Sequence, residues 1–292
     1  MSMTGDFLIT KEFLKELSPC TDGYRWFCET YPDGGKYQEI LDRLCELDRF
    51  CDARWLLDKV GATDDVLEID SIDDKEKSIC FAGTIIASKN LTLKKIKAGG
   101  YIEAGGYIEA GGYIEAGGHI KAGEYIEAGG YIEAGGHIKA GGYIEAGGYI
   151  KAGGYIKAGG YIKAGGYIEA GGHIKAGGYI EAGGYIEAGG YIEAGWHIKA
   201  GGYIEAGEHI KAGGHIKAGG HIKADWHIKA GGYIKAGGHI KAGGYIEAGK
   251  DYGVYAGIGV ILSDMKKSGY VKAQEKPENL MCGYWEGEGY EI

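Results

Sequence analysis

"AGGYIEAGGYIEAGGHIKAGEYIEAGG", residues 104–130, repeats one hexapeptide and varies it only at certain positions. Isoleucine recurs at every sixth residue from Ile96 to Ile246, and each isoleucine is followed two positions later by an alanine. Residues two apart in a strand share a face. The repeat therefore predicts short strands with Ile and Ala pointing inward, Tyr or His and Glu or Lys pointing to solvent, and glycine pairs at the corners.

The exceptions to the repeat support this phasing. The second glycine is replaced by Glu124, Trp196, Glu208, Trp226 and Lys250, and the first only by Asp225. A core of isoleucine and alanine could not accommodate a charge or a tryptophan without a large desolvation cost. The second glycine position is therefore expected to face solvent.

One hexad cannot bury its isoleucine alone, but hexads stacked in successive coils can bury it between them. Parallel coils place identical side chains above one another at the strand spacing of roughly 4.8 Å. Three hexads close a triangular coil, and a two-sided coil of two hexads is the alternative. The predicted fold is mainly β: a single-stranded parallel β-helix, triangular and of either hand, with a small N-terminal α-helical module.

Four segments are expected along the chain. They are a helical module (1–62), an N-terminal capping coil (63–95), the hexapeptide-repeat β-helix (96–250) and a C-terminal cap and tail (251–292). From Val66, "VLEID" and "SICFAGTIIASKNLTLKKIKAGG" have strand patterns, and "DYGVYAGIGVILS" and "GYVKA" after the array read as decayed repeats.

The first sixty residues have helix signals. Thr10 can cap "KEFLKEL", Thr21 or Asp22 can start "GYRWFCET", and "KYQEILDRLCELDRFCDARWLLDKV" reads as one helix that closes on Gly61. Residues at helical spacing are expected to form the core of this module, although its aromatic members could also line a pocket. They are Trp26, Phe27, Ile40, Leu41, Leu44, Trp55, Leu56 and Leu57.

The six cysteines include no CxxC pair and no neighbouring histidine. They are interpreted as buried free thiols, without disulfides, cofactor or metal. A zinc site built from Cys20, Cys28, Cys45 and Cys51 is the alternative, because four thiolates are a common zinc ligand set.

Charge is distributed unevenly. The net charge of −9 is the sum of −8 over residues 1–92 (11 basic, 19 acidic), +2 over 93–250 (17 and 15) and −3 over 251–292 (4 and 7). A near-neutral array argues against a uniformly acidic rod that imitates DNA. The chain has neither a readable signal peptide nor an apolar run long enough to span a membrane, so a cytoplasmic protein without a membrane partner is predicted.

Two parts of the chain resemble known families. The array is similar to hexapeptide-repeat β-helices, and its I-x-A-G-G phrase resembles that of bactofilin-type triangular β-helices, which polymerise. The leader "PCTDGYRWFCETYPDGGKYQEILDRLCELDRFCDARWLL" resembles a helical leader that precedes repeat arrays in uncharacterised phage and bacterial proteins. These resemblances imply a β-helix fold and, through the leader, a phage or prophage product.

Substitutions of the corner glycines and an excess of lysine are concentrated in the C-terminal part of the array, residues 194–250. Residues 194–250 hold eight Lys against three Glu and one Asp, whereas residues 97–193 hold seven Lys and eleven Glu. With three hexads per coil, acidic, aromatic and basic residues converge on one corner, and Trp196 is a further exposed aromatic. The candidate binding residues are Glu208, His209, Lys211, Asp225, Trp226, His227, Lys229 and Trp196.

These observations favour a non-enzymatic binding protein. The array has no interrupting loop of the kind that resembling acyltransferases use, and no threonine rows for ice binding. A protein partner is expected first, and the specific hypothesis is a phage-encoded inhibitor of a bacterial defence protein. With three hexads per coil, Tyr and His residues 18 apart would stack into columns on the three faces, as do Tyr131, Tyr149, Tyr167, Tyr185 and Tyr203. The alternatives are a self-assembling scaffold, a nucleic acid or nucleotide at the basic half, a carbohydrate on these columns, and a lateral homodimer through them. Simple cross-coil stacking would also explain the columns.

Overall fold

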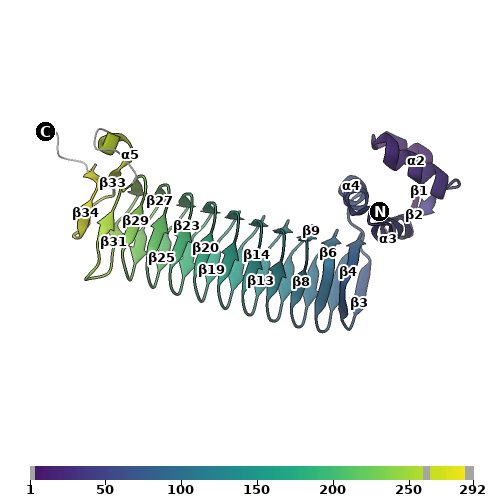
Figure 1. The fold of residues 1–292 in the computed structure, drawn as a ribbon, viewed down its shortest axis with the longest axis horizontal. Helices are drawn as coiled ribbons and strands as arrows, with labels where there is room; N and C mark the ends of the chain where they lie inside the picture. The colour runs from purple at the N-terminus through teal and green to yellow at the C-terminus, as the bar shows by residue number, and fades with distance from the viewer. Residues whose placement is uncertain (1–3, 259–263, 287–292) are drawn as a thin grey trace. The chain divides into compact units, whose positions relative to one another are not determined.

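The computed structural model describes residues 4–258 and 264–286. The fold is a parallel β-solenoid of about 12 turns, about 18 residues apart, with a small N-terminal helical region (Figure 1). The chain divides into two compact units, Met1–Gly123 with Glu133–Gly136, and Glu124–Ile132 with His137–Ile292.

In the first unit, β1 (Leu8–Ile9) is followed by helices α1 (Lys11–Glu16) and α2 (Thr21–Thr30), and β1 pairs antiparallel with β2 (Gly35–Lys36) after the second helix. The predicted cap of α1 is confirmed, because the Phe13 N–H donates to Thr10 Oγ1 at 3.2 Å. Helix α2 begins at Thr21, one of the two predicted starts, but neither Thr21 nor Asp22 caps it. Its cap is Cys20, whose Sγ accepts the Gly23 N–H at 3.3 Å.

The long helix predicted after residue 35 is in fact two helices, α3 (Tyr37–Glu46) and α4 (Phe50–Val60). The chain turns at Asp48, which has a φ of 54°. There the Arg49 N–H donates to the Leu44 carbonyl at 2.8 Å, and this bond closes the turn. At the other end Gly61, with a φ of 97°, is the C-cap, as predicted.

The helical module packs on the first coils through α3 and α4. The Gln38 side chain donates to the Cys80 carbonyl at 3.0 Å and accepts the Ala82 N–H at 2.8 Å. Lys97 is almost fully buried and pairs with Asp58 at 2.7 Å and with Glu115. Six of the predicted core residues are buried, but Trp26 and Trp55 are only partly buried.

The remaining strands of the first unit are β3 (Val66–Ile69), β4 (Ile72–Phe81), β5 (Thr84–Ala87), β6 (Leu91–Ala98), β7 (Ile102–Ala104), β8 (Ile108–Ala110), β9 (Ile114–Ala116) and β10 (Ile120–Ala122). Strand β12 (Ile132–Ala134) spans the division between the units.

The second unit has three sides. Side 1 consists of β13 (Ile138–Ala140), β16 (Ile156–Ala158), β19 (Ile174–Ala176), β22 (Ile192–Ala194), β25 (Ile210–Ala212), β28 (Ile228–Ala230) and β31 (Ile246–Glu247). Side 2 consists of β11 (Ile126–Ala128), β14 (Ile144–Ala146), β17 (Ile162–Ala164), β20 (Ile180–Ala182), β23 (Ile198–Ala200), β26 (Ile216–Ala218), β29 (Ile234–Ala236), β32 (Val254–Tyr255) and β34 (Leu280–Cys282). Side 3 consists of β15 (Ile150–Ala152), β18 (Ile168–Ala170), β21 (Ile186–Ala188), β24 (Ile204–Ala206), β27 (Ile222–Ala224), β30 (Ile240–Ala242), β33 (Tyr270–Lys272) and β35 (Tyr284–Trp285).

The register follows the repeat without a slip through the regular coils. Ile144 pairs with Ile162 and Ala146 with Ala164, so paired residues lie three hexads apart, and the same spacing holds on every side. From Ile102 to Ile240 every repeat isoleucine is 0% exposed, and the alanines are at most 4% exposed. The coil of three hexads and the inward Ile and Ala are therefore confirmed, and the alternative of two hexads is excluded.

The glycine pairs are needed for the close approach of successive coils. The Gly165 N–H donates to the Ala146 carbonyl at 3.0 Å, and a Cβ on Gly165 would overlap the carbonyl oxygen of Gly147. A Cβ on the second glycine, Gly166, would lie 3.3 Å from Gly148. The first glycine is thus confined by the backbone of the preceding coil, whereas the second tolerates a side chain, as the predicted phasing requires.

The C-terminal segment continues the coils irregularly. Within "DYGVYAGIGVILS", Val254 pairs with Ile234, and residues 259–263 lie outside the described part of the chain. The short helix α5 (Met265–Ser268) precedes "GYVKA", whose Val271 pairs with Ile240. Strand pairing thus supports decayed repeats at Val254 and Val271.

Candidate binding surface

The predicted tyrosine columns form stacked ladders. On side 3, Tyr131, Tyr149, Tyr167, Tyr185 and Tyr203 stack with ring centroids 4.7–4.8 Å apart and planes within 3°. On side 2, Tyr125, Tyr143, Tyr161 and Tyr179 stack at 4.9 Å. Because each ring face is covered by its neighbours, the ladders link successive coils and expose mainly ring edges.

Several tyrosine hydroxyl groups also donate hydrogen bonds to glutamate side chains of the preceding coil. The Tyr143 hydroxyl donates to Glu127 at 2.8 Å, Tyr185 to Glu169 at 3.1 Å, and Tyr203 to Glu187 at 2.7 Å. Burial, together with this carboxylate acceptor, raises the pKa of Tyr185 to about 12 and raises the pKa of Tyr143 and Tyr203 as well. These contacts make the ladders part of the stability of the solenoid.

The raised tyrosine pKa values predict a loss of stability in alkali. An unfolded tyrosine ionises at about pH 10. Below that pH the phenol is protonated in both states, and its buried, hydrogen-bonded form contributes its full stabilisation to the folded protein. This contribution is largest there. It is lost as the pH rises toward the folded pKa of about 12 at Tyr185. Absorbance at 295 nm, which reports phenolate, should rise together with the loss of far-UV circular dichroism. A Tyr185→Phe variant should lose less stability between pH 10 and 12 than the parent chain. Phenolate formation near pH 10 without unfolding would contradict this prediction.

Four histidines link coils in a different way. Nδ1 of His137 accepts the Tyr155 N–H at 3.0 Å, and Nδ1 of His227 accepts the Tyr245 N–H at 3.1 Å. His173 and His215 do the same for Tyr191 and Tyr233. Each of these histidines has a tyrosine three hexads later, which is the sequence signal for this contact, and its ring stacks 3.8–4.0 Å from that tyrosine. An accepting Nδ1 carries no proton, so the proton of the neutral ring is on Nε2.

The structure brings seven of the eight predicted binding residues together around β25 and β28. We call these residues the corner cluster; they are Glu208, His209, Lys211, Asp225, Trp226, His227 and Lys229. The Trp226 N–H donates to the Glu208 carbonyl at 3.0 Å, and Lys211 pairs in register with Lys229. Trp226 is 58% exposed.

Asp225 in the corner cluster occupies a position that elsewhere requires glycine. A Cβ at the first glycine of a regular corner overlaps the carbonyl oxygen of the preceding coil, as at Gly207 and Gly243 on either side. The Asp225 N–H still donates to the Ala206 carbonyl, at 3.2 Å. A residue that breaks a local packing rule is often found at a functional site, so Asp225 marks this corner as distinct.

Trp196, the eighth predicted residue, lies on a different corner. Its N–H donates to Gly178 O at 3.1 Å, and it precedes β23 on side 2, whereas Trp226 precedes β28 on side 1. Trp196 is 67% exposed. The predicted set therefore divides into the corner cluster and a separate tryptophan.

The lysines of the basic part of the array, residues 194–250, are arranged around all three sides of the coil. Over two coils all six Glu/Lys positions are lysine, two on each side; we call Lys211, Lys217, Lys223, Lys229, Lys235 and Lys241 the lysine belt. Lys223 pairs with Glu205, Lys229 with Glu247 at 2.9 Å, and Lys211 approaches Glu193 at 3.7 Å. Within the described residues, Lys217, Lys235 and Lys241 form no ion pair, and like charges in register repel each other.

The cysteines are free thiols, and their predicted burial is confirmed for Cys80 alone of the six. Cys20 and Cys51 are exposed, and the other three, Cys28, Cys45 and Cys282, are partly buried. Cys80 is buried, and burial raises its pKa well above the ordinary value. In the described part of the chain, neither the cysteines nor the stacked histidines form a group of three or more ligands suited to a metal ion.

Comparison with family models matches residues 1–63 to the YdhT N-terminal domain. The match ends just after α4 and its Gly61 cap, and it covers 63 of 292 residues, so it does not extend to the array. No curated protein and no solved structure matched the chain. Among the helices that the structure describes, none has the length and apolar character needed to cross a membrane.

Proposed function

We propose that this chain is a non-enzymatic binding protein that recognises an acidic face of a protein partner through the lysine belt and the corner cluster. The observation that carries the proposal is an exposed Trp226 beside a belt of six lysines, on a solenoid whose interior does not vary. Tryptophan is a frequent anchor at protein interfaces, and a group of lysines attracts an acidic partner and steers its approach. A solenoid stacked in register supplies a preorganised surface, which reduces the entropy cost of binding.

A protein fits the corner cluster better than a nucleic acid does. Asp225 directly precedes Trp226 in the sequence, and Glu208 lies on the same corner one coil earlier, so two carboxylates are close to Trp226. They would repel phosphates close to the aromatic anchor, whereas a protein surface can offer both signs of charge. The tyrosine ladders are also poor platforms for sugars or bases, because neighbouring tyrosines already cover their ring faces.

The matched pair of tryptophans provides the test. Trp226→Ala is expected to reduce capture of the partner from nuclease-treated bacterial lysate by about tenfold or more, as at other tryptophan anchors. Trp196→Ala is the control, because it makes the same substitution at the same position of the hexad on another corner, and it should change capture by less than about twofold. Captured proteins would be quantified by mass spectrometry. Equal losses in both variants, or capture that depends on nucleic acid, would refute the proposal.

The hypothesis of a phage-encoded inhibitor is the specific form of this proposal. It draws support from the resemblance of the leader to those of phage and bacterial repeat proteins, and it places the partner in the bacterial cytoplasm. Inhibition by contact requires no catalytic residue.

A self-assembling scaffold is the second candidate, and the bactofilin-like I-x-A-G-G phrase favours it. Coils that stack in register could add further copies end to end, because strand edges are templates for pairing. Light scattering over a range of concentrations separates the two candidates. A molecular weight that rises with concentration supports the scaffold, and a constant monomer weight removes it.

A further inference from the structure

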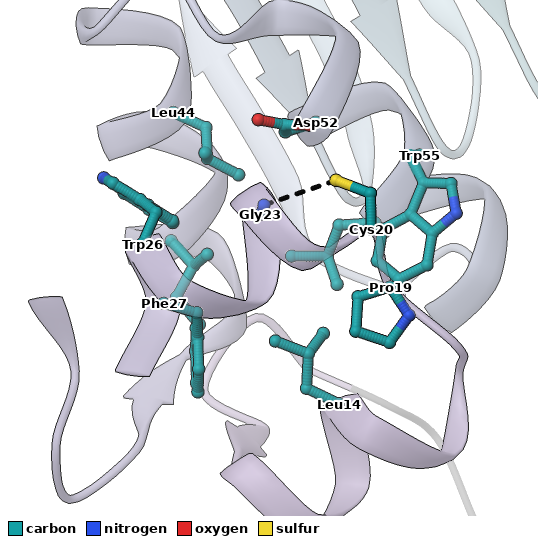
Figure 2. Close-up of a pocket in the computed structure, with 11 residues that line it drawn as sticks. Leu14, Pro19, Cys20, Gly23, Trp26, Phe27, Leu44, Asp52 and Trp55 are labelled. Carbon is teal, nitrogen blue, oxygen red and sulfur yellow. Dashed lines mark hydrogen bonds between the residues drawn. The ribbon is translucent and has the colours of Figure 1, made fainter. Parts of the chain in front are cut away.

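The helical module contains an apolar cavity of about 160 Å³ between α1, α2, α3 and α4 (Figure 2). Its walls include Leu14, Trp26, Phe27, Leu44, Trp55 and Leu56. In Figure 2 Trp26 and Trp55 stand on opposite sides of the cavity. An apolar cavity of about 150 Å³ is large enough to bind benzene, so this space matches one aromatic ring or a branched alkyl group of similar size.

The polar lining of the cavity is acidic. Asp52 and Cys20 face the same gap, next to Gly23 (Figure 2). A Cβ on Gly23 would lie 3.2 Å from Cys20 Sγ and 3.9 Å from Asp52 Oδ1. The glycine therefore keeps space open between the sulfur and the carboxylate.

The Arg49 guanidinium is shared by two carboxylates beside the cavity, Asp52 and Asp22, so the net charge of the three groups is negative. Arg49 Nε donates to Asp52 Oδ2 at 2.6 Å, and its Nη2 donates to Asp22 at 2.8 Å. The Arg49 guanidinium also lies 5.3 Å from the centre of the Trp26 ring. Arg49 binds Oδ2 of Asp52, whereas Oδ1 is the oxygen on the Gly23 side of the cavity.

We propose that this cavity binds a small organic ammonium ion that carries an aromatic or branched alkyl group. The apolar group would fill the space between Trp26, Phe27 and Trp55, and the ammonium would lie at Asp52. Aromatic walls attract cations through the ring quadrupole, and a carboxylate forms a charge-assisted hydrogen bond with an ammonium. A carboxylate ligand of the same size would be repelled, and a neutral one would lack the ionic contact. This site lies in the first unit and is independent of the function proposed for the solenoid.

Three ligands of one size test the proposal on the unaltered chain. Isothermal titration calorimetry should show benzylammonium binding about tenfold more tightly than benzyl alcohol, and benzoate more weakly than either. Equal dissociation constants for benzylammonium and benzyl alcohol, or binding of none of the three, would overturn the proposal. This arm needs no variant, so a failure to fold cannot obscure it.

Variants then locate the site. Asp52→Asn should reduce the preference for benzylammonium to less than about twofold, because it keeps the shape and removes the charge. Asp33→Asn, the same substitution at an exposed residue away from the cavity lining, should leave the preference unchanged. Gly23→Leu, which fills the gap beside Cys20, should abolish binding of both benzyl ligands. A preference for benzylammonium that survives Asp52→Asn would show that Asp52 does not hold the ammonium.

Discussion

The substitution Ile156→Asp is expected to unfold the coils around β16, with a loss of at least about 4 kcal/mol in the free energy of unfolding. Ile156 is 0% exposed and is packed in register between Ile138 and Ile174. A carboxylate there would be surrounded by isoleucine and alanine side chains, which cannot form hydrogen bonds with it. Urea unfolding followed by far-UV circular dichroism measures the loss.

The adjacent residue provides the control for this prediction. Lys157 is exposed and lies in register between Lys139 and Lys175. Lys157→Asp introduces the same side chain on the outer face, where it replaces one of three like charges. The expected change is within about 0.5 kcal/mol. Similar losses in both variants would show that the inward and outward assignment of the repeat is mistaken.

The second large effect is expected at the glycine corners. Gly165→Ala should destabilise the protein by about 3 kcal/mol, at the upper end of the usual cost of overpacking, because its Cβ would overlap the carbonyl oxygen of Gly147. Backbone of the preceding coil cannot move aside as a flexible side chain can. The coil must therefore shift, and the bond from Gly165 to Ala146 would lengthen.

The neighbouring glycine makes the comparison specific. Gly166→Ala places its Cβ 3.3 Å from Gly148, which requires an adjustment of only a few tenths of an ångström. The reduced entropy of the unfolded chain offsets part of that cost, so the change should stay within about 1 kcal/mol. Calorimetric melting of both variants measures the difference. If Gly166→Ala were the more damaging, coil-to-coil approach would not be the reason for the first glycine.

The fold of the array could be predicted because one rule repeats without interruption. The spacing of Ile and Ala gives the inward face, and substitutions such as Trp226 identify the outward glycine. The helical module follows no such rule. The segment around Asp48 has the composition of a helix, and its left-handed turn depends on local hydrogen bonds that composition does not show.

The candidate site was partly predictable for the same reason. Residues three hexads apart, such as Glu208 and Trp226, could be placed together from the sequence. The position of Trp196 could have been derived too, because it precedes Trp226 by five hexads, which is not a whole number of coils. The orientation of the His227 ring and the cavity beside Asp52 depend on rotamers and on gaps between helices. Periodicity carries no information about either.

Each coil takes three hexads, so the number of hexads between two residues determines whether they lie on the same side of the solenoid. Gain or loss of three hexads lengthens or shortens the array and leaves every downstream side chain on its own side. Gain of one hexad turns everything beyond it by one side of the triangle. One hexad inserted between Trp196 and Trp226 would separate them by six hexads, two whole coils, and align them on one corner. Duplication or deletion of hexads could thus change which exposed side chains lie together on one corner, while the buried ladder of isoleucines stays the same.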